Sequence, residues 1–166
     1  MECLSSARFV ECVEEIVKVS DAILDGWKMN IYEGQDNSSY ISKKESSILK
    51  DGDKMMLVTI EYHVAYHISY GVPVLCFNVW KQDGSLMSVE DFWKSNDDLK
   101  DVNMYDTLTQ MDHPVLHKPF ITLHPCRTQE IITPLLEKSK NPVISWLSVT
   151  GPIVHMSSIE EYLKYC

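Results

Sequence analysis

The sequence lacks a long uninterrupted hydrophobic run. Its longest strongly apolar stretch, 72–80, contains Pro73 and is far shorter than the roughly 20 residues that a helix needs to cross a bilayer. The N-terminus also lacks the apolar core of a secretory signal, because Glu2, Arg8 and Glu11 interrupt it. These absences predict a cytoplasmic protein without stable membrane insertion.

Positive charge is scarce as well. The 166 residues contain 15 Lys and Arg against 24 Asp and Glu, which gives a net charge of −9. This balance repels phosphate backbones and anionic lipid headgroups, so nucleic acids and membrane surfaces are poor candidate partners. Hydrophobic residues make up 45% of the chain, and a chain of this length buries roughly 70% of the surface that its unfolded form exposes. We therefore expect a single domain over residues 1–166 that needs no disulfide or structural metal.

Cysteine spacing excludes the common cysteine frameworks. The five cysteines are an odd number at wide, irregular intervals, which matches neither a disulfide scaffold nor a CxxC zinc or redox site. We expect all five to be reduced. The members are Cys3, Cys12, Cys76, Cys126 and Cys166.

No motif for a metal or a nucleotide is present. His63 with His67 and His113 with His117 have the spacing of metal ligands, but no Cys or carboxylate partner stands at a usual zinc spacing. Phosphate-binding glycine loops and dinucleotide fingerprints are missing too. The sequence therefore predicts no metal site and no bound cofactor.

The first third of the chain predicts a helix, a strand and a loop. Apolar residues three or four apart indicate a helix over 7–24, which Ser5 or Ser6 can cap. Residues 27–32 are typical of a short strand. The segment 33–53 is rich in Gly, Ser, Asn, Asp and Lys, which predicts a mobile loop.

The middle of the chain predicts a β-hairpin followed by a short helix. Residues 55–80 are dominated by β-branched and aromatic side chains and are broken near Gly71, which favours two long antiparallel strands. Alternating side chains suggest that the first of these strands continues to Tyr70. Ser88 and Asp91 resemble a capping box at the start of the short helix.

The last third predicts one more strand and then helices. The segment 94–112 is a polar stretch, and 119–123 is typical of a strand. A helix is expected to open at Arg127 or Thr128, and the apolar segment 142–149 precedes a terminal helix over 157–165 that Ser157 or Ser158 can cap. This order of elements predicts a single α+β domain.

Cys126 is the most informative candidate for chemistry. It follows a predicted strand through Pro125 and precedes a predicted helix, whose dipole and free N–H groups can stabilise a thiolate or a tetrahedral oxyanion. His124, two residues earlier, can serve as an acid, a base or a hydrogen-bond donor. Residue types alone favour a simpler reading, in which a reduced cysteine packs beside a structural histidine and proline.

Several segments resemble one enzyme family. The run PFITLHPCRT over 119–128 is similar to the active-site segment of the autophagy-related protein 10 family, the E2-like enzymes of ubiquitin-like conjugation. EYHVAYHISYGVPVLCF over 61–77, His113-Pro114 and SWLSVTGP over 145–152 resemble the same family in the same order. The resemblance covers roughly residues 55–154 and is carried by these motifs jointly.

The resemblance implies an E2-like fold, with an N-terminal helix, an antiparallel β-sheet and helices after the active-site cysteine. It also implies the partners. An E1-like enzyme, autophagy-related protein 7, activates the ubiquitin-like autophagy-related protein 12, whose acyl group passes to Cys126 as a thioester. A lysine of the acceptor, autophagy-related protein 5, then attacks that thioester, and no metal or bound nucleotide is needed on this chain.

The resemblance also implies two supporting residues. Ordinary E2 enzymes carry a His-Pro-Asn tripeptide before the cysteine, with the asparagine as the supposed oxyanion donor. Here Cys126 occupies the third position of the tripeptide, so that asparagine is missing. The residue two before the cysteine and a tyrosine on the preceding sheet match His124 and Tyr70, which the resemblance assigns to the support of the reaction.

Three alternatives remain at this point. The sibling enzyme, autophagy-related protein 3, conjugates a ubiquitin-like protein to phosphatidylethanolamine, but it carries a long acidic insertion and an amphipathic membrane-sensing helix that this sequence lacks. A noncatalytic E2-like binding module would not need Cys126. A cysteine hydrolase would need an acid that orients a histidine, and the sequence assigns none.

Overall fold

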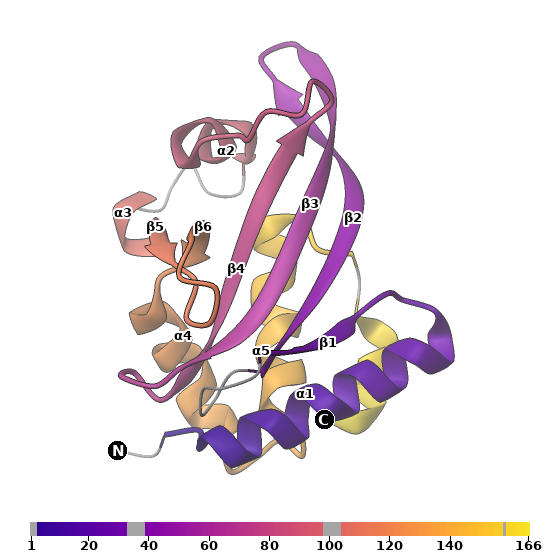
Figure 1. Ribbon diagram of the computed structural model, residues 1–166, viewed down its shortest axis with the longest axis vertical. Helices are drawn as coiled ribbons and strands as arrows, with labels where there is room; N and C mark the ends of the chain where they lie inside the picture. The colour runs from indigo at the N-terminus through magenta and orange to yellow at the C-terminus, as the bar shows by residue number, and fades with distance from the viewer. Residues whose placement is uncertain (1–2, 33–38, 98–103, 158) are drawn as a thin grey trace.

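An antiparallel sheet forms the centre of the protein. The computed structural model describes residues 3–32, 39–97, 104–157 and 159–166. In these residues six strands lie in the order β1-β2-β3-β4-β6-β5, with one long helix before them, two short helices between β4 and β5, and further helical segments after β6 (Figure 1). The α+β class expected from the sequence is confirmed. Within the described residues, no helix combines the length and apolar character needed to cross a membrane.

Helix α1 (Ser6–Ile23) confirms the first predicted element. The Ser5 hydroxyl accepts the backbone N–H of Arg8 at 3.1 Å and thereby caps the helix. Apolar side chains on one stripe, including Phe9 and Ile16, are buried against the core. The helix ends where Leu24 adopts a left-handed backbone conformation with φ 59°.

The expected loop over 33–53 is wrong for most of its length. Strand β1 (Lys28–Ile31) pairs with β2 (Ser39–Asp51), which in turn pairs with β3 along nearly its whole length. A β-ladder is made by backbone groups, so the polar composition of β2 does not prevent pairing. Tyr40, Ile41 and Leu49 supply the buried apolar contacts. The remaining part of the expected loop, 33–38, lies outside the described residues.

The predicted pair of long strands is confirmed as β3 (Lys54–His67) and β4 (Val72–Lys81). Strand β3 is shorter than the alternation suggested. Residues 68–71 form the turn, because the N–H of Gly71 donates back to the carbonyl of His67 at 2.9 Å and Gly71 adopts a φ of 62°. Tyr70 therefore lies in a turn and not on a strand.

Beyond the hairpin, one prediction is confirmed and two elements are new. Helix α2 (Val89–Ser95) begins at Ser88, whose hydroxyl accepts the N–H of Asp91 at 3.1 Å. Within the polar segment 94–112, to which the sequence assigned no element, α3 (Met104–Thr107) and β5 (Leu108–Asp112) form. Strand β5 is an edge strand in which only Leu108 is buried, so it has no hydrophobic alternation to reveal it.

The strand β6 (Pro119–Leu123) is confirmed, and helical segments follow it. They are α4 (Pro125–Ile132), η2 (Thr133–Leu135), α5 (Pro142–Thr150), η3 (Gly151–Val154) and η4 (Glu160–Tyr165). The terminal helix is a short 3-10 helix, and the expected cap at Ser157 is wrong, while the alternative cap, Ser158, lies outside the described residues. The Ser157 side chain bonds the carboxylate of Glu45 instead.

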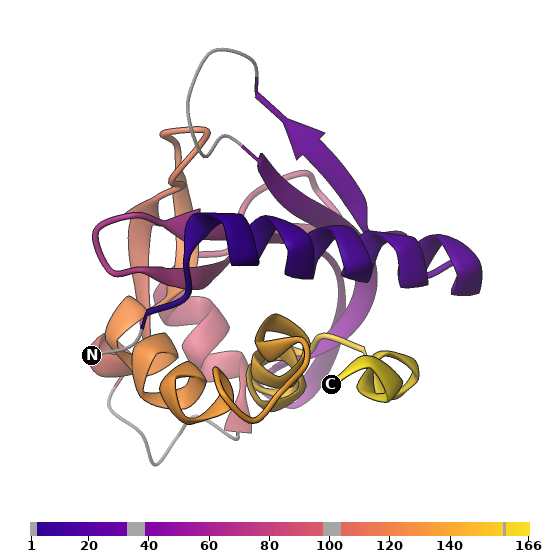
Figure 2. The same cartoon turned by 90° about the horizontal axis from the view of Figure 1, so that it is seen from below.

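Helices cover one face of the sheet. Cross-strand neighbours share a face, so Lys43, Tyr62, Phe77 and Ile121 form one row across it. On this face the Tyr62 hydroxyl donates to the carbonyl of Val154 at 2.6 Å, and α4 and α5 lie together on one side of the sheet (Figure 2). The opposite face carries Tyr40, His63 and Phe120 and is met by the loop between β5 and β6.

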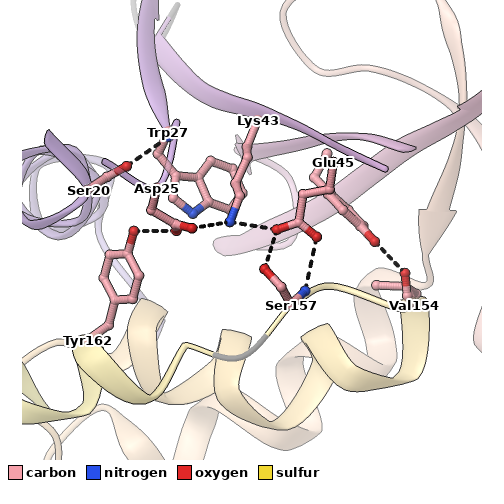
Figure 3. A network of polar contacts seen from close by, with 9 residues as sticks. Ser20, Asp25, Trp27, Lys43, Glu45, Val154, Ser157 and Tyr162 are labelled. Atoms are coloured by element: carbon pink, nitrogen blue, oxygen red, sulfur yellow. Dashed lines mark hydrogen bonds and ion pairs between the residues drawn. The ribbon is translucent and has the colours of Figure 1, made fainter. Parts of the chain in front are cut away.

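A charged network joins the helix-covered face to the C-terminal segment (Figure 3). The Lys43 side chain is 3% exposed and lies between the carboxylates of Asp25 at 2.7 Å and Glu45 at 2.6 Å. Glu45 accepts the N–H of Ser157, and the Tyr162 hydroxyl donates to Asp25 at 2.6 Å. These contacts fasten the last segment to β2 and to the end of α1.

Candidate active site

The site begins at the junction of β6 and α4. Strand β6 ends at Leu123, which places His124 at the N-cap and Cys126 in the first turn of α4. Pro125 occupies the first helical position, where its missing N–H costs nothing and its fixed φ suits the helix. The helix thus begins earlier than the predicted start at Arg127 or Thr128, and Cys126 lies inside it.

The structure brings His124 and Cys126 together. Cys126 is a free, exposed cysteine, and its backbone N–H donates to Nδ1 of His124 at 3.2 Å. Because Nδ1 accepts this bond, the proton of the neutral His124 ring lies on Nε2. The ring therefore keeps an N–H donor on Nε2, two residues before the cysteine in the chain.

The backbone donors in this turn are already engaged. The N–H groups of Arg127 and Thr128 both donate to the carbonyl of His124, at 3.0 Å and 3.3 Å, while that of Cys126 binds the His124 ring. The expectation of free N–H groups for an oxyanion is therefore wrong for the first turn of α4. Among the described contacts, none engages Nε2 of His124, so its N–H can still donate, and Cys126 lies at the positive end of the α4 dipole.

Tyr70 lies at the same end of the sheet but apart from the cysteine. Strand β6 is antiparallel to β4 with Thr122 opposite Cys76, so the chain after β6 runs toward the start of β4 and the turn over 68–71. Figure 1 shows that turn and α4 toward the same end. Tyr70 is 38% exposed and packs edge-on against His67, and within the described contacts none joins it to Cys126.

The environment of the other cysteines separates them from Cys126. Burial raises the pKa of Cys76 to about 12 and also raises the pKa of Cys12. Neither thiol supplies a thiolate near neutral pH. Cys3 is exposed, but it lies before α1 and packs against the turn at Gly71. Among the described residues, no two cysteines are joined by a disulfide.

The histidine pairs of the sequence are rearranged by the fold. His63 contacts His113, with Nδ1 of the first 3.1 Å from Nε2 of the second, whereas His67 packs against Tyr70. Among the described residues, no group of three or more candidate ligands is arranged to hold a metal ion. Sequence reasoning missed this contact, because nothing local to either residue marks it.

Comparison with known proteins places the chain in a family. The family described as "Autophagocytosis associated protein, active-site domain" matches residues 8–161. The chain belongs to this family. This match includes the junction of β6 and α4, where His124 and Cys126 lie.

Individual relatives support the same assignment. The chain is 38% identical over 118 residues to the human protein "Ubiquitin-like-conjugating enzyme ATG10", a match that covers 65% of this chain and 54% of the relative. A protein of the same name from Dictyostelium discoideum is 30% identical over 127 residues, covering 65% of this chain and 55% of the relative. The chain spans about half the length of the curated relatives it matches.

A solved structure confirms the E2-like fold. The protein is similar to the crystal structure of the autophagic E2 Atg10, with a TM-score of 0.63 over 93% of this chain and 98% of that one. The sequence identity in this match is 14%, so the likeness concerns the fold. The N-terminal helix, antiparallel sheet and later helices expected from the resemblance are therefore all present.

Proposed function

We propose that this chain is an E2-like enzyme of autophagy that carries a ubiquitin-like modifier as a thioester on Cys126. The observation that carries the proposal is an exposed, free cysteine in the first turn of a helix, within an active-site domain family. The modifier is autophagy-related protein 12, the donor is the E1-like autophagy-related protein 7, and the acceptor is a lysine of autophagy-related protein 5. The relatives named "Ubiquitin-like-conjugating enzyme ATG10" support a ubiquitin-like modifier in general, and the resemblance of the sequence motifs implies these three partners.

The first step transfers the acyl group between two sulfurs. The thiolate of Cys126 attacks the carbonyl carbon of the thioester on the E1-like enzyme and forms a tetrahedral oxyanion. That intermediate collapses, the carbon–sulfur bond to the E1 breaks, and the E1 leaves as a thiolate that takes up a proton. The exposure of Cys126 gives such a large donor access to the sulfur.

The second step forms the isopeptide bond. A neutral lysine amine of the acceptor attacks the thioester carbon on Cys126, the carbon–sulfur bond breaks, and Cys126 leaves as a thiolate while the amine gives up a proton to water. His124 supports both steps by donating from Nε2 to the oxyanion, since its Nδ1 is committed to the N–H of Cys126. Loss of a comparable oxyanion donor costs on the order of 10² to 10³ in rate.

Tyr70 is proposed to assist from the neighbouring turn. Its ring is held by His67 at a centroid distance of 4.8 Å, while part of the side chain stays exposed at the same sheet end as α4. A chain that approaches Cys126 along this end can meet the phenol hydroxyl. We therefore expect Tyr70→Phe to slow transfer to the acceptor more than loading from the E1.

The decisive experiment is a loading assay. The chain is incubated with the E1-like enzyme, ATP and the modifier, and run on a nonreducing gel beside a reduced sample. A band that disappears with reductant and is absent in Cys126→Ala supports the proposal, and Cys126→Ser is expected to trap an oxyester. Cys3→Ala serves as the matched control, because Cys3 is also exposed.

The outcomes distinguish the alternatives. No band, with the chain folded and the E1 active, contradicts the proposal and leaves a noncatalytic binding module. Transfer to phosphatidylethanolamine in vesicles, without transfer to the protein acceptor, would favour the lipid-conjugating sibling. The acidic side chains Glu11, Glu14 and Glu15 on α1 argue against that second outcome, because anionic lipid repels them.

A further inference from the structure

The strand that delivers the cysteine is weakly attached to the sheet. Strand β6 pairs with β4 at only two register positions, Cys76 with Thr122 and Phe77 with Ile121. Its other neighbour, β5, is an edge strand, so the β5–β6 hairpin gains no further backbone pairing from that side. Something besides the ladder must hold this hairpin if the junction of β6 and α4 is to keep its position.

His113, in the loop between β5 and β6, is fully buried. Its Nδ1 accepts two backbone N–H groups, from Val115 and Leu116, both at 3.1 Å. A ring nitrogen that accepts hydrogen bonds carries no proton, so the proton of His113 lies on Nε2. The ring therefore organises its own loop with one nitrogen and presents a donor with the other.

That donor reaches across β4 to β3. Nε2 of His113 lies 3.1 Å from Nδ1 of His63, which must accept. The proton of His63 then lies on its Nε2, which is 2.7 Å from Oε1 of Glu61. The hydrogen bonds thus all run from donor to acceptor in one direction, from the loop N–H groups through His113 and His63 to the Glu61 carboxylate.

We propose that His113, His63 and Glu61 form a clamp that fastens the β5–β6 hairpin to β3 and thereby positions Cys126. The three are positioning residues, and their effect on catalysis rests on the proposed function. The clamp spans β4 because β4 lies between β3 and β6 in the sheet. It secures the loop end of the hairpin, while the N–H of His124 donates to the carbonyl of Thr107 at 2.8 Å at the other end.

Aromatic packing completes the clamp. The Tyr40 ring stacks on His63 at 5.0 Å and meets the edge of His113 at 4.8 Å. Phe120, on β6 itself, packs against both histidines at 4.9 Å and 5.2 Å. The clamp therefore joins β2, β3, the hairpin loop and β6 through rings whose orientation depends on one another.

The two histidine rings of the clamp stay neutral at physiological pH. Burial lowers the pKa of His113 to about 3, and burial lowers the pKa of His63 even though Glu61 opposes the shift. The other titratable groups facing the pair are Lys44 on β2, Tyr40 and His117. Protonation of either ring would turn an acceptor nitrogen into a donor and break the single direction of the bonds.

The tautomers provide a test that does not depend on activity. Long-range ¹H–¹⁵N spectra of the histidine rings at pH 7 are expected to show protonated Nε2 and unprotonated Nδ1 for both His63 and His113. Protonated Nδ1 on either ring, or averaging between tautomers, would overturn the clamp. Assignment uses His63→Gln and His113→Gln, each of which removes one ring from the spectrum.

Variants test the positioning role. Glu61→Gln retains an acceptor for His63, whereas Glu61→Ala removes it, and His113→Ala removes the centre of the clamp. At a temperature where every variant is folded, we expect Glu61→Ala and His113→Ala to raise hydrogen exchange at Cys126 and β6 by on the order of tenfold, and to slow discharge of the preformed thioester similarly. Glu61→Gln and the exposed loop variant His117→Asn are the matched controls and are expected to behave as wild type.

Each failure points to a different conclusion. Wild-type exchange and discharge in the folded Glu61→Ala and His113→Ala variants would overturn the clamp. Equal losses in Glu61→Gln and Glu61→Ala would overturn it too, because the acceptor would then be irrelevant. If wild type forms no thioester, the proposed function fails, while the spectra and hydrogen exchange still decide whether the clamp holds the hairpin.

Discussion

The two faces of the sheet bury different kinds of polar group: one face buries ions and the other buries neutral rings. On the helix-covered face, Lys43 is charged and lies between Asp25 and Glu45. On the other face, His63 and His113 are buried as neutral rings joined by directed hydrogen bonds. Ions need partners of opposite sign, whereas neutral rings need matched donors and acceptors. The first arrangement fastens the C-terminal segment and the second fastens the hairpin that leads to Cys126.

The largest expected effect tests the charged face. Lys43→Met leaves two carboxylates close together without their counter-charge, and breaking such a buried network costs about 3 to 5 kcal/mol of unfolding free energy. Urea unfolding monitored by tryptophan fluorescence measures it. Lys44→Met, at a neighbouring and mostly exposed lysine, is the matched control and should cost well under 1 kcal/mol. Equal effects at the two positions would remove the distinction between the faces.

The next largest effect is a difference between the two faces in how the free energy of unfolding depends on pH. The folded-state pKa of His113 lies near 3, below the ordinary value of about 6.5, so its stabilising neutral form is complete above pH 6.5 and its contribution is lost as pH falls toward 3. His113→Gln removes this titration. Relative to its own stability at pH 7, the variant should lose about 2 kcal/mol less than wild type by pH 5.

Unfolding in urea at pH 7, 6 and 5 checks this slope. Thr128→Val is the reference, because it leaves both histidines and every charged group in place and should follow the wild-type pH dependence between pH 7 and pH 5. Parallel curves for wild type and His113→Gln would show that His113 is not held neutral by the fold.

A matched pair of tyrosines sharpens the comparison further. The Tyr162 hydroxyl donates to the Asp25 carboxylate, so Tyr162→Phe should cost about 1.5 kcal/mol in thermal or urea unfolding. Tyr40 contributes its ring to the neutral face, through stacking on His63. Tyr40→Phe keeps that ring and is expected to change stability by less than about 0.5 kcal/mol. If Tyr40→Phe cost more stability than Tyr162→Phe, the hydroxyl bond would matter on the neutral face and the ring packing on the charged face, contrary to this assignment.

The smallest effect concerns a hydroxyl outside both networks. Thr128 in α4 is fully buried, and its Oγ1 has no hydrogen-bond partner among the described residues. Thr128→Val replaces the hydroxyl by a methyl group of similar shape and should raise stability by about 0.5 kcal/mol. A shift of the melting temperature to higher values checks this. A loss of stability would show that the Thr128 hydroxyl forms a hydrogen bond in solution. The polar contacts of the helix-covered face would then include α4.

Local patterns were sufficient where an element depends mainly on its own residues. The sequence predicted four such features, because their apolar spacing and capping residues act within a few positions. They are helix α1, the β3 and β4 pair, the cap of α2 at Ser88 and strand β6. The expected loop over 33–53 failed because β2 pairs through backbone groups and hides its few buried side chains among polar ones. Strand β5 failed for the same reason, since an edge strand needs no apolar alternation.

The candidate site divides in the same way. Cys126 and His124 are two residues apart, so the sequence alone determined that they lie together. The periods of the apolar residues along the chain likewise determined the α+β class. Only the tertiary structure decided that His113 meets His63, fifty positions away in the chain, and that Lys43 meets Asp25 and Glu45. The physical reason is that buried polar groups are satisfied by whichever strand or loop the fold brings across the sheet, and no local pattern records that choice.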